Sequence, residues 1–466
     1  MRPLAMSVLA ALVAGTFASS QATAGTLGAQ FAARYGLATS RTAVLGGGKI
    51  QHVIVVVQEN RTIDNLFQGF PGADTLPYGM SGGVRKRLIP LPLQYALDPD
   101  HSHMGFVADY DNGALDGFDH RYVNRGCYQM RPQCTAYAFV RSSDSVIYFS
   151  LAKQYALADH VMEMNEGPSF ANHIHLVAAS GGYPIAVAGN EKEGANGPGC
   201  MSPSDSTVPG IDLRIAFPGG LLPNPIPACR NLATVLGLVD QQGLTWRYYT
   251  PTVTDVKNIS LDFWTPPVYV KALYANDRPK VVAPETRILD DIRGGALASV
   301  SYTAPTIVES DHPHQPAIGE DPQAGPHWVD SIVSAVAASP AYRNNTAILV
   351  TWDDWGGWYD HYVPPAQFHY GATANQYGFR TPLLVMSPYV VKAVDHAPRS
   401  QASIIRFIES VFGLPSLGAL DAKTDDLSGM FNFGQAPIRY QQAGMRTVPA
   451  RFRGAETTLL HADPDE

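Results

Sequence analysis

A run of β-branched residues that ends in a polar cluster constrains the fold of this chain more than any other feature. Residues 53–57 read VIVVV, and Gln58, Glu59, Asn60 and Arg61 follow without a break. An apolar run without polar alternation is typical of a strand that is buried on both faces, as in the centre of a parallel sheet. Ligands of open α/β sheets bind outside the carboxyl ends of such strands. Glu59 and Asn60 are therefore candidates for a functional site.

Strand-like and helix-like segments alternate along the rest of the chain. Apolar runs predict strands at 244–249, 305–308, 347–352 and 383–386, and helical spacing predicts helices at 145–157, 170–180, 328–338 and 403–412. This alternation is typical of a mostly parallel sheet with helices on both faces. Because 45% of the 466 residues are apolar, the chain can bury a large core. We predict a single α/β domain over residues 25–466.

The composition changes to Gly, Pro, Asn and Ser between residues 190 and 230. We predict that this segment is an insertion loop over one edge of the sheet. The four cysteines, Cys127, Cys134, Cys200 and Cys229, allow three pairings. Short separations favour Cys127 with Cys134 and Cys200 with Cys229, and the second pair would staple the insertion.

Residues 1–24 have the features of a cleaved signal peptide. Arg2 precedes an apolar stretch from Leu9 to Phe17, and residues 22–24 read ATA, a small-x-small cleavage signal. The apolar stretch is shorter than the roughly 20 residues of a spanning helix, which disfavours a membrane anchor. We therefore expect a secreted or periplasmic protein, in which disulfides form.

The charge of the chain argues against nucleic acid as a partner. Its formal net charge is −8, and Lys and Arg form no extended cluster. Nucleic-acid binding draws on clustered basic side chains. Nothing in the sequence indicates an obligate protein partner either.

Ser169 opens a predicted helix in the segment Glu166-Gly-Pro-Ser-Phe-Ala-Asn172. A serine in this position is most often a helix N-cap, with its hydroxyl on a backbone N–H. A helix N-terminus also attracts phosphate, and a hydroxyl there acts as a nucleophile when a metal lowers its pKa. The G-x-S-x-G motif of serine esterases is not present here. The residues alone leave both the N-cap and the nucleophile open.

Further chemistry-bearing residues follow the strand predicted at 347–352. Asp353 and Asp354 are adjacent carboxylates, and a divalent cation would offset their repulsion, although a solvated acidic turn is the alternative. Histidines beside carboxylates are metal ligands or proton donors about as often as surface residues. Together these groups suit metal-assisted phosphoryl transfer. The histidines concerned are His101, His103, His312 and His361.

Four segments, in order, resemble signatures of the phosphoesterase family that includes bacterial and plant non-specific phospholipases C and secreted acid phosphatases. A shorter D-H-P element at residues 311–313 also fits, and the resemblance extends from about Lys49 to Phe433. It implies an alkaline-phosphatase-like α/β/α sandwich. The four segments are Glu59 to Asn65 (E-N-R-[ST]-[FI]-D), Gly167 to His173 (G-P-[ST]-x-P-N-R), Trp352 to His361 and Tyr377 to Pro388.

Position by position, the resemblance implies roles for individual residues. Ser169 would attack phosphorus to give a phosphoserine, and His312 would lie near the leaving group or the phosphate. The family's Pro and Arg in the nucleophile segment are Ala171 and His173 here. The phosphate contact of that Arg is therefore expected to be missing or supplied by Arg380. The metal ligands would be Glu59, Asn60, Asp353 and Asp354; further catalytic candidates are His103 and His361, and phosphate-binding candidates are Asn172, Arg380 and His101.

The expected cofactor is one or more divalent metal ions, with Ca²⁺, Mg²⁺, Mn²⁺, Zn²⁺ and Fe²⁺ all compatible with oxygen and nitrogen ligands. The expected substrate is a phospholipid, cleaved by phospholipase C action to diacylglycerol and a phosphorylated head group, or a small phosphomonoester, as for an acid phosphatase. An inactive binding protein is the third alternative, although such a protein needs no nucleophile beside clustered acids. A lipase would present an apolar rim for transient membrane contact. The aromatic residues that would form this rim, or equally a core, are Trp352, Trp355, Trp358, Tyr359 and Tyr362.

Overall fold

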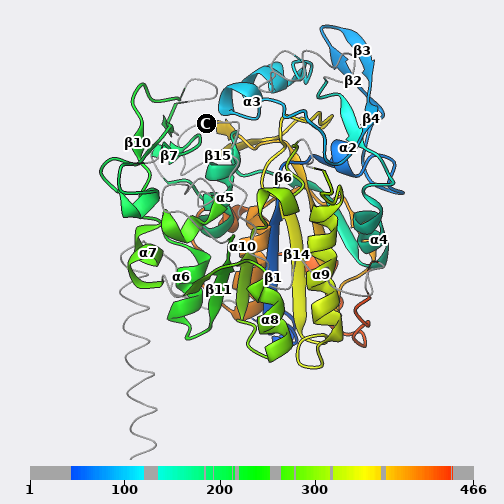
Figure 1. Cartoon of the computed structure of the whole chain (residues 1–466), viewed down its shortest axis with the longest axis vertical. Coiled ribbons are helices and arrows are strands. Elements are labelled where there is room, and N and C mark those ends of the chain that lie inside the picture. Colours follow the sequence, from blue (N-terminus) through cyan, green and yellow to red (C-terminus); the bar gives the residue numbers. More distant parts are fainter. Residues whose placement is uncertain are drawn as a thin grey trace, which may run out of the picture.

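A nine-stranded sheet forms the centre of the computed structural model (Figure 1). All strands run parallel to β1 except β17, which is antiparallel to both of its neighbours. The order is β12 (Val281–Val282), β11 (Trp246–Tyr249), β13 (Val300–Thr303), β1 (His52–Gln58), β14 (Thr346–Trp352), β17 (Arg380–Met386), β6 (Ala156–Met162) and β18 (Ala393–Asp395), with β19 (Arg399–Ser400) also on β6. The structure describes residues 44–119, 135–182, 185–192, 194–212, 214–215, 220–251, 264–277, 280–314, 318–368, 374–441 and 443.

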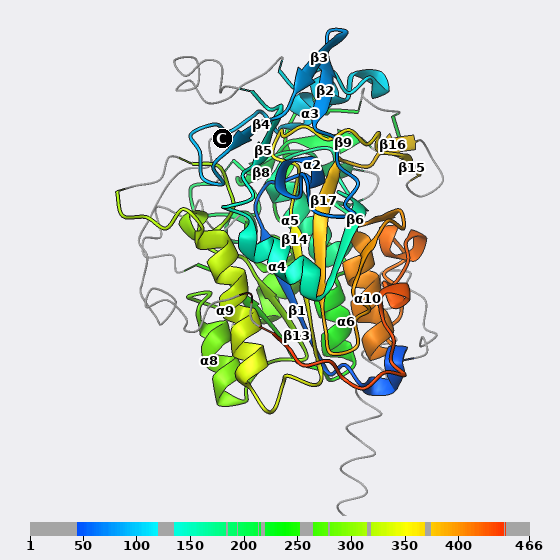
Figure 2. The ribbon, with the colours of Figure 1, turned by 90° about the vertical axis from the view of Figure 1, so that its right-hand side faces the viewer.

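Helices cover both faces of this sheet, which confirms the predicted α/β/α sandwich (Figure 2). The apolar faces of the helices in both layers pack on the sheet, and together with it they form one continuous hydrophobic core. One layer contains α4 (Val146–Gln154), α8 (Arg287–Gly294) and α9 (Ala324–Ala338), and the other contains α5 (Ser169–Ala178), α6 (Val235–Gln241) and α10 (Ala402–Phe412). No helix in the described part of the chain is long and apolar enough to cross a membrane.

The central strands form where the sequence predicted them. In β1 every residue from Val53 to Gln58 is buried, and all seven residues of β14 are buried as well. Strands in this position have helices on both faces, which explains why their apolar residues do not alternate with polar ones.

Two segments differ from the prediction. The helix expected at 145–157 ends at Gln154, and the chain then turns into strand β6. Residues 305–308 are not a strand: Ile307–Glu309 is a 3₁₀ helix that follows β13. Strand β13 is short and contains Ser, Tyr and Thr, so its apolar signal is weaker than that of the segment beyond it.

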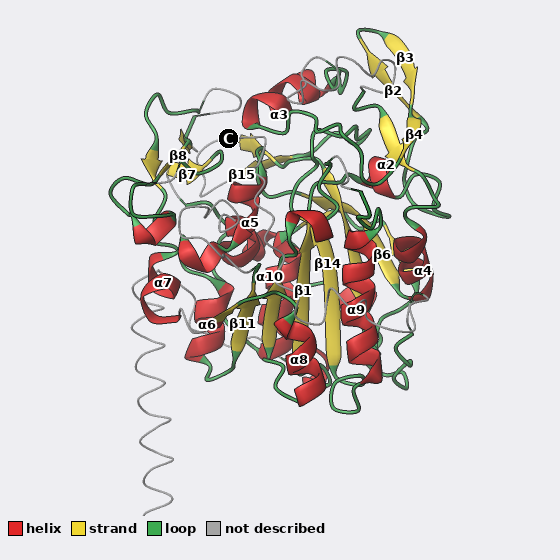
Figure 3. Ribbon diagram, in the orientation of Figure 1, coloured by secondary structure: helices red, strands yellow, loops and turns green. Residues whose placement is uncertain are grey.

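Loops and small sheets lie above the carboxyl ends of the parallel strands (Figure 3). They include the helices α2 (Ile63–Leu66) and α3 (His103–Tyr110). Helix α7 (Lys271–Asp277) contacts the 3₁₀ turn Pro266–Val268. The small sheets pair β2 (Tyr78–Ser81) with β3 (Val84–Arg87), β4 (Ile89–Leu91) with β5 (Ala138–Val140), β7 (Ile185–Val187) with β9 (Gly210–Asp212), β8 (Thr207–Val208) with β10 (Ile226–Pro227), and β15 (Ala366–Phe368) with β16 (Ala374–Gln376).

The predicted insertion carries the predicted disulfide. Cys200 and Cys229 are joined, with their Cα atoms 4.6 Å apart. The segment contains the short strands β8 to β10 rather than loop alone. Cys127 and Cys134 lie outside the described residues, so their pairing stays a prediction.

Candidate active site

Several polar side chains meet at the carboxyl edge of the central sheet. Glu59 and Asn60 follow β1, and Asp353 and Asp354 follow β14, which pairs with β1 in register. Glu163 follows β6, and Ser169 begins α5 shortly afterwards. All six residues are fully buried.

Glu59, Asn60 and Asp353 form an oxygen-rich cluster. The side-chain amide of Asn60 turns one of its two terminal atoms toward the carboxylates, 2.7 Å from Glu59 Oε2 and 3.1 Å from Asp353 Oδ1. Its other terminal atom lies 3.0 Å from His101 Nε2. Two arrangements satisfy this geometry: either the amide nitrogen donates to both carboxylates, or the amide oxygen shares a cation with them.

The charge of the cluster favours a cation. Asp353 Oδ2 accepts no hydrogen bond from the described residues, although the side chain is fully buried. Burial, followed by the nearby charges of Asp354 and Asp353, raises the pKa of Glu163 well above its ordinary value. Buried carboxylates need a positive charge or protons to offset their desolvation, and the residues present therefore fit a divalent metal ion.

His173 completes this cluster, a role the sequence did not indicate. Its Nε2 lies 2.9 Å from Glu59 Oε1 and 3.7 Å from Asp353 Oδ2, so the three side chains could hold one metal ion. Burial lowers the pKa of His173 to about 4, which keeps the imidazole neutral. The family's Arg at this position would add a charge, whereas His173 offers a nitrogen ligand or a hydrogen bond.

The hydroxyl of Ser169 belongs to the site and not to a helix cap. Ser169 is the first residue of α5, and the helix has no side-chain cap. Instead, Ser169 Oγ donates a hydrogen bond to Asp354 Oδ2 over 3.1 Å. Asp354 Oδ1 accepts a second bond from the backbone N–H of Gly356. The geometry therefore favours the nucleophile interpretation over the N-cap interpretation.

Two predicted residues position the loop before Ser169. Asn172 Nδ2 donates to the carbonyl of Gly167 over 2.8 Å and, more weakly, to Glu163 Oε2 over 3.4 Å. His103 Nδ1 donates to the carbonyl of Glu166 over 2.9 Å. Both contacts hold the backbone of this loop, while the catalytic role expected for His103 and the phosphate contact expected from Asn172 stay predictions.

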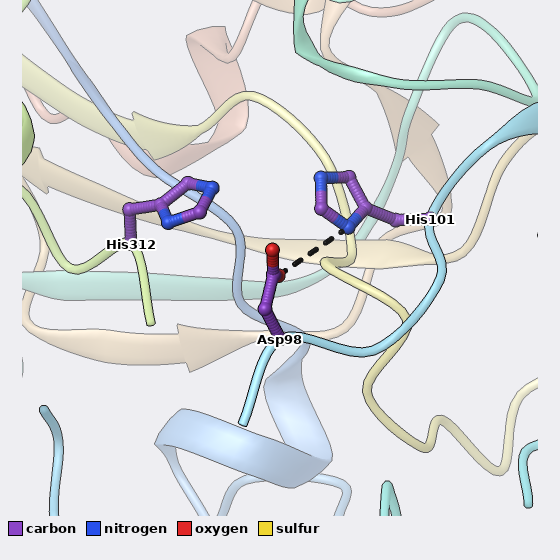
Figure 4. A group of neighbouring side chains, drawn as sticks. All are labelled: Asp98, His101 and His312. Carbon is purple, nitrogen blue, oxygen red and sulfur yellow. Dashed lines mark ion pairs between the residues drawn. The ribbon is translucent and has the colours of Figure 1, made fainter. Parts of the chain in front are cut away.

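His101 and His312 lie together beside the oxygen cluster. The Asp98 carboxylate sits between the two imidazole rings, whose centroids are 6.1 Å apart (Figure 4). His101 Nδ1 donates to the carbonyl of Pro99, and His312 Nδ1 donates to that of Pro313. The neutral His312 therefore presents its Nε2 lone pair, which takes no hydrogen bond from the described residues.

Arg380 and His361 lie in a different cluster from Ser169, so the phosphate contact expected from Arg380 and the catalytic role expected for His361 stay predictions. The guanidinium donates to Asp360, over 2.6 Å, and to Asp64, over 3.2 Å. His361 Nδ1 is 2.6 Å from Asp64 Oδ2. Burial opposes both charged forms, but Arg380 holds the pKa of Asp360 below its ordinary value and Asp64 raises the pKa of His361. These side chains bind one another, so the cluster holds the start of β17 in place.

The aromatic residues are core and do not form an exposed rim. Trp352 and Trp355 are fully buried, and Trp358 and Tyr359 are nearly so. Tyr362 alone is half-buried. Large apolar side chains are exposed elsewhere at the same end of the molecule, among them Met104 in α3 and Val84 in β3.

Sequence reasoning missed three residues of the site. Glu163 follows a buried strand as Glu59 does, but the helix expected at 145–157 ran into the first two residues of β6 and no strand was predicted there, so that signal was not used. His173 stands four residues after Ser169, on the same helix face. Arg61 is buried and donates to the carbonyls of Leu93 and Asp311, so it fixes the residue before His312.

Comparison with known proteins gives the family. Residues 50–415 match the model of the phosphoesterase family. Phospholipase C B of Mycobacterium tuberculosis is 24% identical over 447 residues, which cover 83% of this chain and 78% of that protein. Non-hemolytic phospholipase C of Burkholderia pseudomallei is 23% identical over 414 residues, which cover 78% of this chain and 55% of the relative.

A search of solved structures finds a protein in the alkaline phosphatase superfamily from Vibrio parahaemolyticus. It is 11% identical with a TM-score of 0.38, and the match covers 83% of this chain and 73% of that chain. The family assignment rests instead on the family model, which spans most of the sequence. The chain therefore belongs to the phosphoesterase family and is a hydrolase that acts on phosphate esters.

Proposed function

We propose that this protein is a metal-dependent phosphodiesterase of phospholipase C type that uses Ser169 as its nucleophile. The observation that carries the proposal is the contact between Ser169 Oγ and Asp354, beside the buried cluster of Glu59, Asn60 and Asp353. The relatives named phospholipase C support the substrate class.

Asp354 is placed to take the proton of the nucleophile in the first step, since its Oδ2 accepts a hydrogen bond from Ser169 Oγ. Ser169 Oγ attacks phosphorus, a bond forms between the two, and its proton passes to Asp354. The bond from phosphorus to the glycerol oxygen breaks, and that oxygen takes a proton from solvent as diacylglycerol leaves. A bound divalent cation would lower the pKa of the hydroxyl and offset charge on the phosphate oxygens.

The second step is hydrolysis of the phosphoserine: the oxygen of a water molecule bonds to phosphorus, the bond from phosphorus to Ser169 Oγ breaks, and Oγ takes back the proton held by Asp354. His312 holds its proton on Nδ1, against the carbonyl of Pro313, and its Nε2 lone pair can accept a proton from the attacking water. His101 contacts the Asn60 amide through its Nε2, and its ring lies against that of His312. It therefore connects the proposed base with the proposed metal ligands. His103 and Asn172 keep the Ser169 loop in place.

Product analysis tests the proposal. The purified protein is incubated with phosphatidylcholine and, separately, with a simple phosphomonoester. Diacylglycerol plus phosphocholine, formed only without chelator, is the expected result. Inorganic phosphate from the monoester alone would contradict phospholipase C action and favour an acid phosphatase, and no product from either would favour an inactive binding protein.

We further propose that the protein is exported through residues 1–24 and folds as one domain over residues 25–466. The disulfide between Cys200 and Cys229 supports an oxidising compartment. Amino-terminal sequencing of the protein recovered from the culture medium or periplasm tests both the export and the start at Gly25.

A further inference from the structure

A further group of side chains that could hold a metal ion lies where β6 meets the edge strands β18 and β19. Asp159, His160 and His396 each offer a ligand atom, and these atoms lie within 4.8 Å of one another. His396 Nδ1 is 2.9 Å from Asp159 Oδ1. Asp74 joins the group, since its Oδ2 is 2.8 Å from His160 Nε2 and its backbone N–H donates to Asp159 Oδ2.

Two irregularities of the backbone build this cluster. Strand β6 has a bulge against β17, because Val161 pairs with Thr381 while Ala158 pairs with Leu383. Asp159 and His160 therefore both stand opposite Pro382, which has no N–H to donate. A bulge places two successive side chains on one side of a sheet, where a regular strand would separate them.

The neighbouring edge is interrupted at the same level. Strand β18 pairs with β6 up to Ala158, and β19 resumes the pairing at Val161. Residues 396–398 between them leave the sheet, which brings His396 against Asp159. The side chain of His396 is 52% exposed and that of Asp74 39%, so an ion can enter from solvent.

We propose that Asp159, His160 and His396 form a second metal site that binds a divalent transition-metal ion such as Zn²⁺, and that Asp74, beside His160, turns to become the fourth ligand when the ion binds. Two imidazoles with two carboxylates would then make an N₂O₂ set, which suits the tetrahedral coordination of zinc. The two nitrogen donors disfavour Ca²⁺ and Mg²⁺, which prefer all-oxygen ligands. The site stands independently of the function proposed for Ser169.

A metal ion at this site would also affect the buried cluster around Arg380, because Asp74 contacts both. Its carboxylate also lies 3.3 Å from His361 Nε2 and 3.4 Å from Arg380 Nη1. An ion that holds Asp74 would therefore clamp the β18–β19 edge to the charged cluster at the start of β17. We expect zinc to stabilise this edge of the sheet.

Zinc binding to the full chain tests the proposal. The protein is stripped with chelator, and Zn²⁺ is titrated in competition with a chromophoric chelator. Compared with the wild type, His396→Ala is expected to lose one equivalent of zinc or to bind it at least about tenfold more weakly, since even supporting residues of metal sites have effects of that size. His327→Ala is the matched control: His327 pairs with Asp321 in a partly exposed pair, and no third metal-binding side chain of the described residues joins it.

The two sites are separated by a further variant. Asp353→Asn removes a carboxylate of the Ser169 cluster and should keep the zinc that His396→Ala loses. Conversely, His396→Ala should keep phosphoesterase turnover. Equal zinc binding by wild type and His396→Ala, or zinc lost only in Asp353→Asn or in His327→Ala, would overturn the proposal. His160→Gln repeats the test at a second ligand.

Discussion

The substitution Ser169→Ala removes the Oγ atom and adds no volume, so it is the most direct test of the proposed nucleophile. Because the side chain left by Ser169→Ala cannot attack phosphorus, we expect kcat to fall at least about 10³-fold, as when other enzyme nucleophiles are removed. Circular dichroism should show an intact fold. Ser331→Ala is the control, since Ser331 Oγ is buried but donates to a backbone carbonyl within α9. Wild-type turnover of Ser169→Ala would assign the attack to another group.

The sequence predicted which residues lie at the strand ends, but not which side chains they contact. Glu59 and Asp353 follow long apolar runs, so their place at one sheet edge follows from the sequence pattern. Arg380 follows no such rule: it begins β17, and three carboxylates from distant segments, Asp64, Asp74 and Asp360, decide where its guanidinium points. Such long-range partners have no local signal, so the sequence could not predict that three carboxylates surround Arg380.

At the scale of elements, the approach of β17 to β6 leaves no room at Gly378. A Cβ there would lie 2.4 Å from the carbonyl oxygen of Asn165 and 2.7 Å from Glu163 Cβ. We expect Gly378→Ala to destabilise the fold by about 1–3 kcal/mol, because a backbone atom must move to accommodate the methyl group. Urea unfolding measures the loss. Gly294→Ala is the control, since a Cβ at Gly294, the last residue of α8, has no atom within 4 Å; an equal loss in both variants would contradict this account.

Helix α10 carries a carboxyl group that makes stability depend on pH. Burial, and then the charge of Asp421, raise the pKa of Glu409 from 4.5 to about 8. The folded state therefore keeps this proton up to a pH of about 8, whereas the unfolded chain loses it near its ordinary pKa. The group stabilises the fold fully below that ordinary pKa, and this contribution is lost as the pH rises through the folded pKa, at about 1.4 kcal/mol per pH unit.

Glu409→Gln should remove this dependence. The free energy of unfolding of the wild type, compared with the variant, is expected to fall more steeply between about pH 5 and 7.5, because only the wild type exchanges a proton there. Urea unfolding at several pH values in that range gives both slopes. Parallel slopes would show that Glu409 ionises in the folded protein near its ordinary pKa, and that Arg406, which donates to it over 3.1 Å, offsets its burial.

Helices and strands could be predicted where the sequence has a long apolar run or a regular helical spacing of apolar residues. Strands β1 and β14 and helices α9 and α10 lie where expected, because long apolar runs and amphipathic periods are local properties. Strand β6 was missed since α4 and β6 are separated by a single residue, and a helical spacing continues across the join. The direction of β17 could not be predicted at all, since strand pairing depends on the path of the loop between Trp352 and Arg380.

At the scale of the whole molecule, the proposed metal at the Ser169 centre would join elements that are far apart in the sequence. Its candidate ligands follow β1 and β14 and lie on α5, so binding should stabilise the complete fold. A ligand that binds only the folded state adds about 2.7 kcal/mol at a concentration of one hundred times its Kd. Removing this metal should therefore lower the Tm by several degrees.

The proposed zinc site at Asp159 and His396 must be disabled for this test, because chelator would remove its ion as well. The experiment is therefore carried out in His396→Ala. In that variant, chelator should lower the Tm, and Asp353→Asn added to it should abolish the response, because the buried Oδ2 of Asp353 would no longer be available to the cation. Asp421→Asn is the control: Asp421 is equally buried, but its Oδ1 accepts from the backbone N–H of Ala419 and its Oδ2 from that of Gly418. A Tm that chelator leaves unchanged in His396→Ala would mean that no metal stabilises the Ser169 centre, and the charge of its carboxylates would then have to be offset by protons, beginning with Glu163.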